Sequence, residues 1–486
     1  MKNKSLSKGG LYYLIYNVLN IAFPFISGIY VSRILLPDNI GNVTAAQNLA
    51  QYFVILAFLG IPTYGLREIS KTRNEFVECS RVYSELFIIN LCSTLIFLMI
   101  YIVLVFSVKI YREELLIYLL AGISIALNSI NISWLYEGLE EFGYISLRNM
   151  IFKLISFIFL IVFVRSNEDT VWYLLMSVVG TAGNNVLNII YAPKFVKFTR
   201  EGLHFRRHFK SIFFLVTVNI AIELYSLVDI TMMKFMCNSQ NIAYYRYGVG
   251  IKKILLQIVN TFTMVLVPRI SLFFREGKIY EFNRLLSKAF ILIILTSLPM
   301  IVGLYFTADN LLVKLYGLSY SASAGVVKIL SLLLIISPIG YLLGSRVMLV
   351  AGKEKLMIIP VGVGAVINIV GNFILIPLYD EYGAAVASVF SEICVMVIYI
   401  LMSHKYYRLK CVRASIGKAV ISCFFMGAYL FFMSRLELND GIMIGLQIVG
   451  AVVFYGLGLF ILKEEITIDY LKKIIKKIRE VFTTLK

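Results

Sequence analysis

The sequence predicts an all-α polytopic membrane protein with about 14 transmembrane helices, arranged as two parallel six-helix lobes forming a V-shaped central cavity plus two C-terminal helices. Of its 486 residues, 59% are hydrophobic and 15% are charged, and the mean hydropathy is +0.84. Soluble domains are about half apolar and a quarter charged. The apolar runs are continuous rather than alternating, which favours helices over a transmembrane barrel.

Each predicted span is a run of about 20 mostly apolar residues, and short polar segments separate the runs. The spans cover residues 10–31, 42–62, 82–107, 114–134, 146–165, 171–191, 211–236, 242–268, 286–306, 325–349, 355–377, 382–402, 415–434 and 441–462. They group into an N-lobe at residues 1–200, a C-lobe at 201–405, and a C-terminal part at 406–486. The C-terminal part holds the last two spans and a basic amphipathic helix at 468–482, which we expect on the cytoplasmic membrane surface.

The charge distribution predicts the orientation in the membrane. The 46 Lys and Arg residues exceed the 28 Asp and Glu residues and give a net charge of +18. Most of the cations fall in alternate connecting segments, as the positive-inside rule describes. Both termini are therefore expected in the cytoplasm, where the basic surface faces anionic membrane lipids rather than nucleic acid. "MKNKSLSKGG" leads into the first span without a small-residue cleavage site, so we expect that span to be retained.

Two stretches of the chain are similar to each other. "NIGNVTAAQNLAQ" begins at Asn39 and "NIAYYRYGVGIKK" begins at Asn241, and each leads through an apolar helix to a basic exit, "REIS" with Arg67 and "PRIS" with Arg269. The two starts are as far apart as the first and seventh spans. This repeat predicts two lobes of the same orientation, an arrangement typical of alternating access around a site near the membrane midplane.

Three cations lie within the eighth predicted span: Arg246, Lys252 and Lys253. The two lysines lie roughly 15 Å from its outer end, near the centre of a hydrocarbon core about 30 Å thick. A charge there costs about 2.5 to 3.5 kcal/mol unless it faces water or an opposite charge. Arg246 and Lys253 share a helix face, so we expect them to line the cavity. The alternative is pairing with Glu223 and Asp229 of the seventh span.

Polar and aromatic residues accompany these cations. The matching positions of the first lobe carry no charge, so the repeat itself does not require cations there; these positions are Thr44, Ala50 and Gln51. Asn48 and Gln51 are candidates for hydrogen bonds to a polar substrate, with helix–helix contacts as the alternative. Three tyrosines next to Arg246 are expected either to pack on the substrate or to form an interfacial belt; they are Tyr244, Tyr245 and Tyr247.

Catalytic, metal and nucleotide motifs are missing from the sequence. The six cysteines form no C-x-x-C pair, and no phosphate-binding G-x-x-x-x-G-K-[ST] loop occurs. His204 and His208 lie in "HFRRHFK", where the adjacent cations oppose a metal ion, so we interpret this segment as a solvated basic inner loop. Without a long outer loop or an acidic D-x-D-like site, a membrane polysaccharide polymerase is disfavoured, and we expect neither an enzyme nor a bound cofactor.

Four stretches resemble one family in its order along the chain. They are "SRILLPDNIG" from Ser32, "ISWLYEGLEEFGYISLRN" from Ile132, "VDITMMKFMCNSQNIAYYRYGVGIKKI" from Val228, and "NIVGNFILIPLYDEYGAAVASVFSE" from Asn368. They resemble the bacterial polysaccharide flippases, the Wzx-type branch of the multidrug/oligosaccharidyl-lipid/polysaccharide exporter superfamily. The resemblance covers residues from about 10 to about 405. One departure is Asp380, at or near a position where the family usually has Gly.

The resemblance implies a function in the bacterial inner membrane. Such a protein moves an undecaprenyl-pyrophosphate-linked oligosaccharide repeat unit to the outer leaflet for capsule, O-antigen or exopolysaccharide assembly. Its partners would be membrane lipids, the polyprenyl-pyrophosphate-linked substrate and other polysaccharide-assembly membrane proteins. Arg246, Lys252 and Lys253 would meet the anionic substrate. The alternative is a cation-coupled multidrug or small-solute exporter of the same superfamily, for which acidic rather than basic cavity residues are expected.

Further charged residues are candidates for coupling or gating. Glu392 is a candidate site for H⁺ or Na⁺ coupling, with an ion pair to Lys328 as the alternative. Arg67 and Arg269 occupy matching helix ends at the cytoplasmic side, where gating or capping is expected. Glu137 lies at the inner end of the fourth span, in either a functional connection or a solvated turn.

Overall fold

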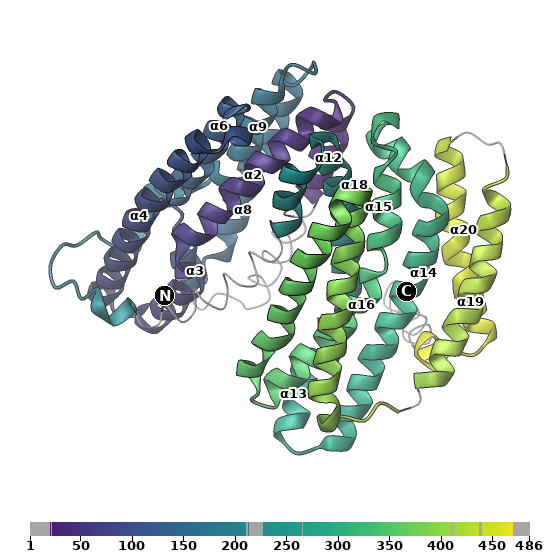
Figure 1. Cartoon of the computed structure of the whole chain (residues 1–486). Helices are drawn as coiled ribbons and strands as arrows, with labels where there is room; N and C mark the ends of the chain where they lie inside the picture. The colour runs from purple at the N-terminus through teal and green to yellow at the C-terminus, as the bar shows by residue number, and fades with distance from the viewer. Residues whose placement is uncertain are drawn as a thin grey trace, which may run out of the picture. The chain divides into compact units, whose positions relative to one another are not determined.

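The computed structural model describes residues 20, 22–209, 212, 227–264, 266–410, 412–436 and 440–469, and all regular structure in these ranges is helical (Figure 1). This confirms the predicted all-α fold class. The chain divides into two compact units, residues 1–246 and 247–486. Helix α12 (Ser239–Met264) contributes its first two turns to the first unit and its remainder to the second.

The first unit is a bundle of long helices. α2 packs on both α4 and α6, and α9 packs on α6 and α8, helices that Figure 1 labels. The helices are Ala22–Ser32, α2 (Pro37–Phe58), α3 (Ile61–Thr72), α4 (Phe76–Ser107), α5 (Lys109–Arg112), α6 (Leu115–Asn128), α7 (Ser133–Gly138), α8 (Phe142–Phe163), α9 (Thr170–Val178), the π-helical η1 (Val179–Gly183), α10 (Asn185–Tyr191), the 3₁₀ turn η2 (Ala192–Lys194) and residues 227–236.

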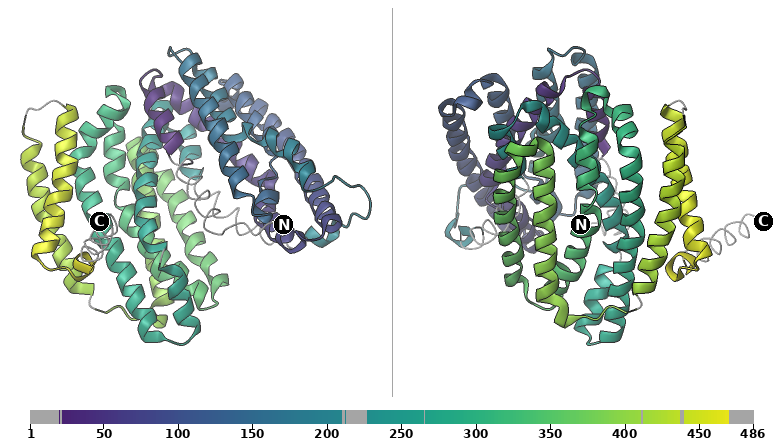
Figure 2. Two further views of the ribbon diagram at one scale, coloured as in Figure 1. Left: turned by 180° about the vertical axis from the view of Figure 1, so that it is seen from behind. Right: turned by 45° about the vertical axis from the view of Figure 1, so that its right-hand side comes forward.

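The second unit is built around α14, which packs against α15, α16, α19 and α20. Helices α19 and α20 lie side by side, as the yellow-green pair in Figure 2 shows. After α12 come α13 (Val267–Arg275), α14 (Ile279–Tyr316), η3 (Leu318–Tyr320), α15 (Ser323–Leu330), α16 (Leu333–Ile339), the π-helical η4 (Gly340–Arg346), α17 (Val347–Val350), η5 (Glu354–Met357), α18 (Ile358–Ser403), η6 (His404–Tyr406), α19 (Val412–Met433) and α20 (Asp440–Ile461).

The described helices agree with the predicted number of spans. Eleven helical segments within the described ranges are long and apolar enough to cross a membrane. One of them, Glu354–Tyr406, holds two predicted spans, and its backbone leaves the helical conformation at Asp380, where φ is 48° and ψ is −126°. Ala22–Ser32 belongs to the first predicted span and residues 227–236 to the seventh. The amphipathic tail helix falls outside the described residues from 470 onward.

Each unit has a segment, here called the strap, whose backbone is hydrogen-bonded to a long helix: the segment around Lys197 and Thr199 in the first unit, and the segment around Arg408 and Lys410 in the second. In the first unit, the backbone N–H groups of Lys197 and Thr199 donate to the hydroxyls of Ser80 and Ser84 on α4, at 3.0 and 2.9 Å. The second unit has the same contacts on α14. There the backbone N–H groups of the later segment donate to the side chains of two α14 residues, Arg408 to Asn283 at 2.8 Å and Lys410 to Ser287 at 3.0 Å. The two units therefore share local contacts as well as their helical order.

Candidate functional site

The first turn of α12 lies directly against α2. A Cβ atom added at Gly41 would lie 1.7 Å from the carbonyl oxygen of Ser239, so only glycine permits this approach. The neighbouring Asn42 accepts two hydrogen bonds through Oδ1, from the Ser239 hydroxyl at 2.6 Å and from Nζ of Lys234 at 2.9 Å. The start of α12 is thereby fixed on α2 within the first unit.

Arg246 follows two turns later on α12. Its Nη1 donates to the hydroxyl of Thr44 at 2.7 Å, and its guanidinium carbon lies 5.8 Å from the ring centre of Tyr173. The hydroxyl of the adjacent Tyr245 donates to Asp229. The structure thus places the Arg246 guanidinium against a hydroxyl of α2 and the aromatic face of Tyr173 on α9.

Asn48 lies one turn beyond Thr44 on the same face of α2. Its side-chain nitrogen donates to the backbone carbonyl of Leu227 at 3.1 Å and to the hydroxyl of Thr231 at 2.9 Å. Asn48 is 6% exposed, and its Oδ1 accepts no hydrogen bond from the described part of the chain. Gln51, a further turn along, is exposed. The structure therefore brings Asn48 close to the Arg246 region, and α2 carries a polar face there.

The remaining two predicted cations lie farther along α12. Lys252 is half-buried and Lys253 is exposed. Of the three tyrosines, Tyr244 is half-buried and its role stays a prediction, while the other two do not have the predicted surroundings. Tyr245 is 4% exposed and Tyr247 is 6% exposed, and Tyr247 packs on Tyr316 with ring centres 4.1 Å apart. These two side chains belong to packed cores, so the prediction that they form a sugar platform or an interfacial belt is wrong.

The predicted acidic partners have mixed surroundings. Glu223 lies outside the described residues, and Asp229 accepts the hydrogen bond from Tyr245 already noted. Glu392 is half-buried and accepts a hydrogen bond from Ser337 at 3.0 Å. Lys328 forms its ion pair with Asp309, at 2.6 Å, rather than with Glu392. The alternative interpretation of Glu392 as the partner of Lys328 is therefore wrong, while its coupling role stays a prediction.

Of the predicted gating residues, Arg269 and Glu137 lie in terminal helical turns, whereas Arg67 lies in the middle of α3, so its predicted place at a helix end is wrong. Arg67, on α3, contacts Glu68 at 3.3 Å and lies 5.7 Å from the ring centre of Tyr64. Arg269, on α13, is exposed. Glu137 is half-buried at the end of α7. The surroundings of these three residues are compatible with either gating or helix capping. Their roles therefore stay predictions.

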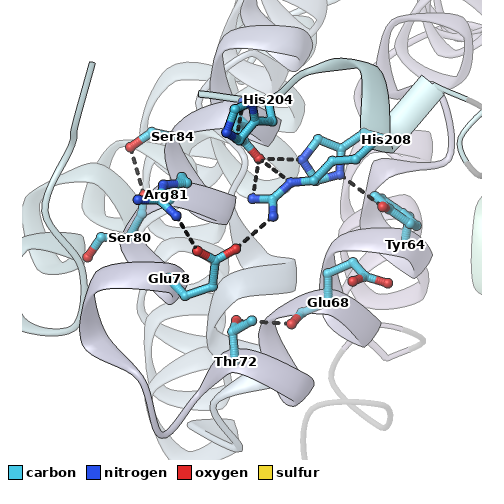
Figure 3. A network of polar contacts seen from close by, with 11 residues as sticks. Tyr64, Glu68, Thr72, Glu78, Ser80, Arg81, Ser84, His204 and His208 are labelled. Atoms are coloured by element: carbon cyan, nitrogen blue, oxygen red, sulfur yellow. Dashed lines mark hydrogen bonds and ion pairs between the residues drawn. The ribbon is translucent and has the colours of Figure 1, made fainter. Parts of the chain in front are cut away.

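Figure 3 shows a polar network that was not predicted from the sequence. Glu85 on α4 is fully buried and binds three groups of one segment: the backbone N–H of His204 at 2.5 Å, the Arg207 guanidinium at 2.6 Å, and Nε2 of His208 at 2.6 Å. The Tyr64 hydroxyl lies 2.9 Å from Nδ1 of His208. An ionised carboxylate only accepts, so Nε2 of His208 carries a proton.

This network corrects the interpretation of "HFRRHFK" as a solvated loop. His204 is exposed, but His208 is only 1% exposed. Arg207 also pairs with Glu78 at 2.7 Å. Partial burial opposes the charged guanidinium, but the hydrogen bonds to Glu78 and Glu85 outweigh that effect and raise the pKa of Arg207. An available signal was Glu85 itself, because a carboxylate inside an apolar helix needs a partner.

The fold defines a class: a polytopic helical membrane protein with the architecture of known transporters. It is similar to the lipid II flippase MurJ in an inward closed conformation, with a TM-score of 0.63 and 16% identity over 89% of this chain and 98% of that one. It is also similar to an inward-facing multidrug resistance MATE family transporter of the MOP superfamily, with a TM-score of 0.64 and 12% identity over 79% of this chain and 93% of the other.

The family follows from the sequence match. Residues 6–274, more than half of the chain, match the family described as "Polysaccharide biosynthesis protein", and the chain belongs to that family. Two curated relatives carry the name "Putative O-antigen transporter". The Shigella dysenteriae protein is 23% identical over 385 residues, 78% of this chain and 95% of its own length. The protein from Escherichia coli strain K12 is 23% identical over 414 residues, 82% of this chain and 96% of its own length.

Proposed function

We propose that this protein moves an undecaprenyl-pyrophosphate-linked oligosaccharide repeat unit from the cytoplasmic to the outer leaflet of the bacterial inner membrane by alternating access. The product would serve the assembly of O-antigen, capsule or exopolysaccharide. Membership of the polysaccharide biosynthesis family supports this proposal, as does the similarity to relatives named as O-antigen transporters. The lipid II flippase neighbour, whose name describes a lipid substrate, agrees in fold.

The observation that carries the proposal is the cationic helix α12. Arg246 and Lys253 are two turns apart on this helix, which lies within an apolar segment, and Lys252 adds a third positive charge. Charges within a bilayer core are costly, so they are usually retained for function or paired. A pyrophosphate carries negative charge and several acceptor oxygens, which match guanidinium and ammonium donors. The polar face of α2, with Asn48 and Gln51, would supply hydrogen bonds to the sugars.

A complementation experiment tests the proposal. A host deleted for its own flippase is complemented with the wild-type protein, with Arg246→Ala, with Lys253→Ala, and with the double variant. The readouts are surface polysaccharide, inner-leaflet lipid-linked intermediate and the amount of protein in the membrane. We expect the double variant to lose most surface polymer and to accumulate the intermediate at a normal protein level.

The matched control is the double variant Arg275→Ala/Lys353→Ala, which removes the same charge from two exposed positions. We expect it to complement like the wild-type protein. Normal polymer from Arg246→Ala/Lys253→Ala would assign these cations to structure rather than to the transport path. Failure of the wild-type protein in every such host, at normal membrane levels, would favour the small-solute exporter instead.

A further inference from the structure

A cavity of about 460 Å³ opens between the first turns of α4 and the strap that follows α10. A volume in the range of about 300 to 1,000 Å³ is typical of small-molecule sites. Both apolar and charged side chains line it, chiefly Phe76, Val77, Arg81, Lys197, Glu201 and Gly202. Two cations and one carboxylate leave the lining with one net positive charge. This site lies apart from Arg246 in sequence and belongs entirely to the first unit.

The Arg81 guanidinium is held by an ion pair, but not all of its hydrogen-bond donors have an acceptor among the described residues. Its Nη1 donates to Glu78 at 2.7 Å, while its buried Nε has no hydrogen-bond partner among the described residues. Gly202 lies against the same group, since a Cβ there would be 3.2 Å from Nε. Gly202 also has a φ of +65°, which favours glycine. The strap thus approaches the guanidinium closely and leaves a donor in need of an acceptor.

The cavity lies at the start of α4, in line with exposed apolar side chains of that helix. Five exposed apolar residues lie on one face of α4: Val77, Leu95, Met99, Val103 and Phe106. Arg81 is one turn from Val77 and about four turns from Leu95, so it lies on the same face. Phe76 is 50% exposed and Val77 is 70% exposed. A ligand in this cavity would therefore contact cations and exposed apolar side chains together.

The second unit repeats this arrangement on α14. Arg284 forms an ion pair with Glu281 at 3.7 Å, three residues apart, as Arg81 does with Glu78. Arg408 takes the place of Lys197 in the strap. Tyr280, at the position of Val77, is 64% exposed. Two cations thus lie at each place, one of them half-buried in the first unit, and this recurrence favours a shared ligand chemistry.

We propose that the cavity lined by Arg81 and Lys197 binds the phosphate of an anionic phospholipid of the cytoplasmic leaflet. The guanidinium and ammonium groups would donate to the phosphate oxygens, and Phe76 and Val77 would contact the upper part of the acyl chains. One net positive charge suits a phosphodiester better than a pyrophosphate. The arrangement on α14, with Arg284 and Arg408, would be the equivalent site of the second unit. This inference does not depend on the proposed transport substrate.

The test is native mass spectrometry of the full-length protein in detergent, titrated with phosphatidylglycerol or with zwitterionic phosphatidylethanolamine. The wild-type protein is compared with Arg81→Gln/Lys197→Gln and with the charge-matched control Arg206→Gln/Arg275→Gln. Both control positions are exposed. We expect the site variant to lower the apparent affinity for phosphatidylglycerol at least three-fold, with no change in the control. Equal binding by all three proteins would overturn the proposal.

Two further competition measurements distinguish a bound phospholipid from other ligands that carry phosphate. Inorganic phosphate is added as a competitor, and displacement of phosphatidylglycerol at submillimolar phosphate would show that the cavity takes free phosphate instead. A polyprenyl pyrophosphate that displaces phosphatidylglycerol from the wild-type protein but not from the site variant would assign the cavity to that lipid and overturn the phospholipid assignment. The single variant Lys197→Gln controls for misfolding, because the hydrogen bond from Lys197 to α4 is made by its backbone N–H and not by its side chain. We expect this single variant to unfold at the wild-type temperature and still to bind phosphatidylglycerol more weakly.

Discussion

Arg246 and Thr44 are joined by a hydrogen bond of 2.7 Å although 202 residues separate them. This separation equals that between Asn39 and Asn241, where the two similar stretches begin. The arginine of the second copy therefore contacts the residue that occupies its own position in the first copy. The contact places a cation of the proposed transport path on a hydroxyl of α2.

Thr44→Val tests whether this hydroxyl orients the guanidinium. We expect transport in complemented cells to fall about ten-fold or more, since a hydrogen bond to a charged group contributes about 1.5 to 3 kcal/mol. Thr44→Ser keeps the hydroxyl and should retain wild-type activity. Surface polymer and membrane level are measured for both variants. Equal activity of the valine and serine variants would show that the contact does not matter for transport.

Gly41→Ala tests the close approach of α12 to α2. The added Cβ would lie 1.7 Å from the Ser239 carbonyl oxygen, so the helix start must move. We expect a loss of about 1 to 3 kcal/mol in the free energy of unfolding, as for other overpacked sites. Thermal unfolding in detergent measures it. Gly303→Ala is the control, because no atom lies within 4 Å of a Cβ at that position; a similar loss in both variants would contradict the packing argument.

Glu85→Ala tests the buried network. Removing the carboxylate leaves the buried His208 without its acceptor, while the more exposed Arg207 keeps its ion pair with Glu78. Breaking such a pair from one side costs about 3 to 5 kcal/mol. We expect a markedly lower unfolding temperature and faster proteolysis in the segment around His204. Glu201→Ala, at an exposed position, should unfold like the wild-type protein. Unchanged proteolysis of the Glu85 variant would show that the network does not hold this segment.

Asp380→Gly is expected to stabilise the protein. Asp380 has a φ of 48° and a ψ of −126°, a backbone conformation that glycine adopts far more readily. Relief of this strain should add about 1 kcal/mol to the stability, which a thermal-unfolding comparison with the wild-type protein would detect. The control Asp380→Ala keeps a Cβ and should give no gain. A gain of the same size for alanine would show that the carboxylate, not the backbone, is the source of strain.

The sequence predicted the helical class and the spans because continuous apolar runs depend on local composition. It also identified Arg246 as unusual, since one charge in an apolar run is visible without a structure. The contact of Arg246 with Thr44 was not predicted. The repeat shows which positions of the two lobes are equivalent, but it does not show which residues are in contact. His208 was misjudged for a similar reason: its neighbours along the chain are cations, whereas its partners Glu85 and Tyr64 come from distant helices.

We propose that the cations of α12 bind the substrate as it crosses the membrane. The most direct measurement reconstitutes the purified protein in liposomes with a fluorescent polyprenyl-pyrophosphate-linked oligosaccharide and follows its arrival in the opposite leaflet. The account predicts translocation by the wild-type protein and by Arg275→Ala/Lys353→Ala, and at least ten-fold slower translocation by Arg246→Ala/Lys253→Ala. Equal rates for all three proteins at equal reconstitution would contradict it.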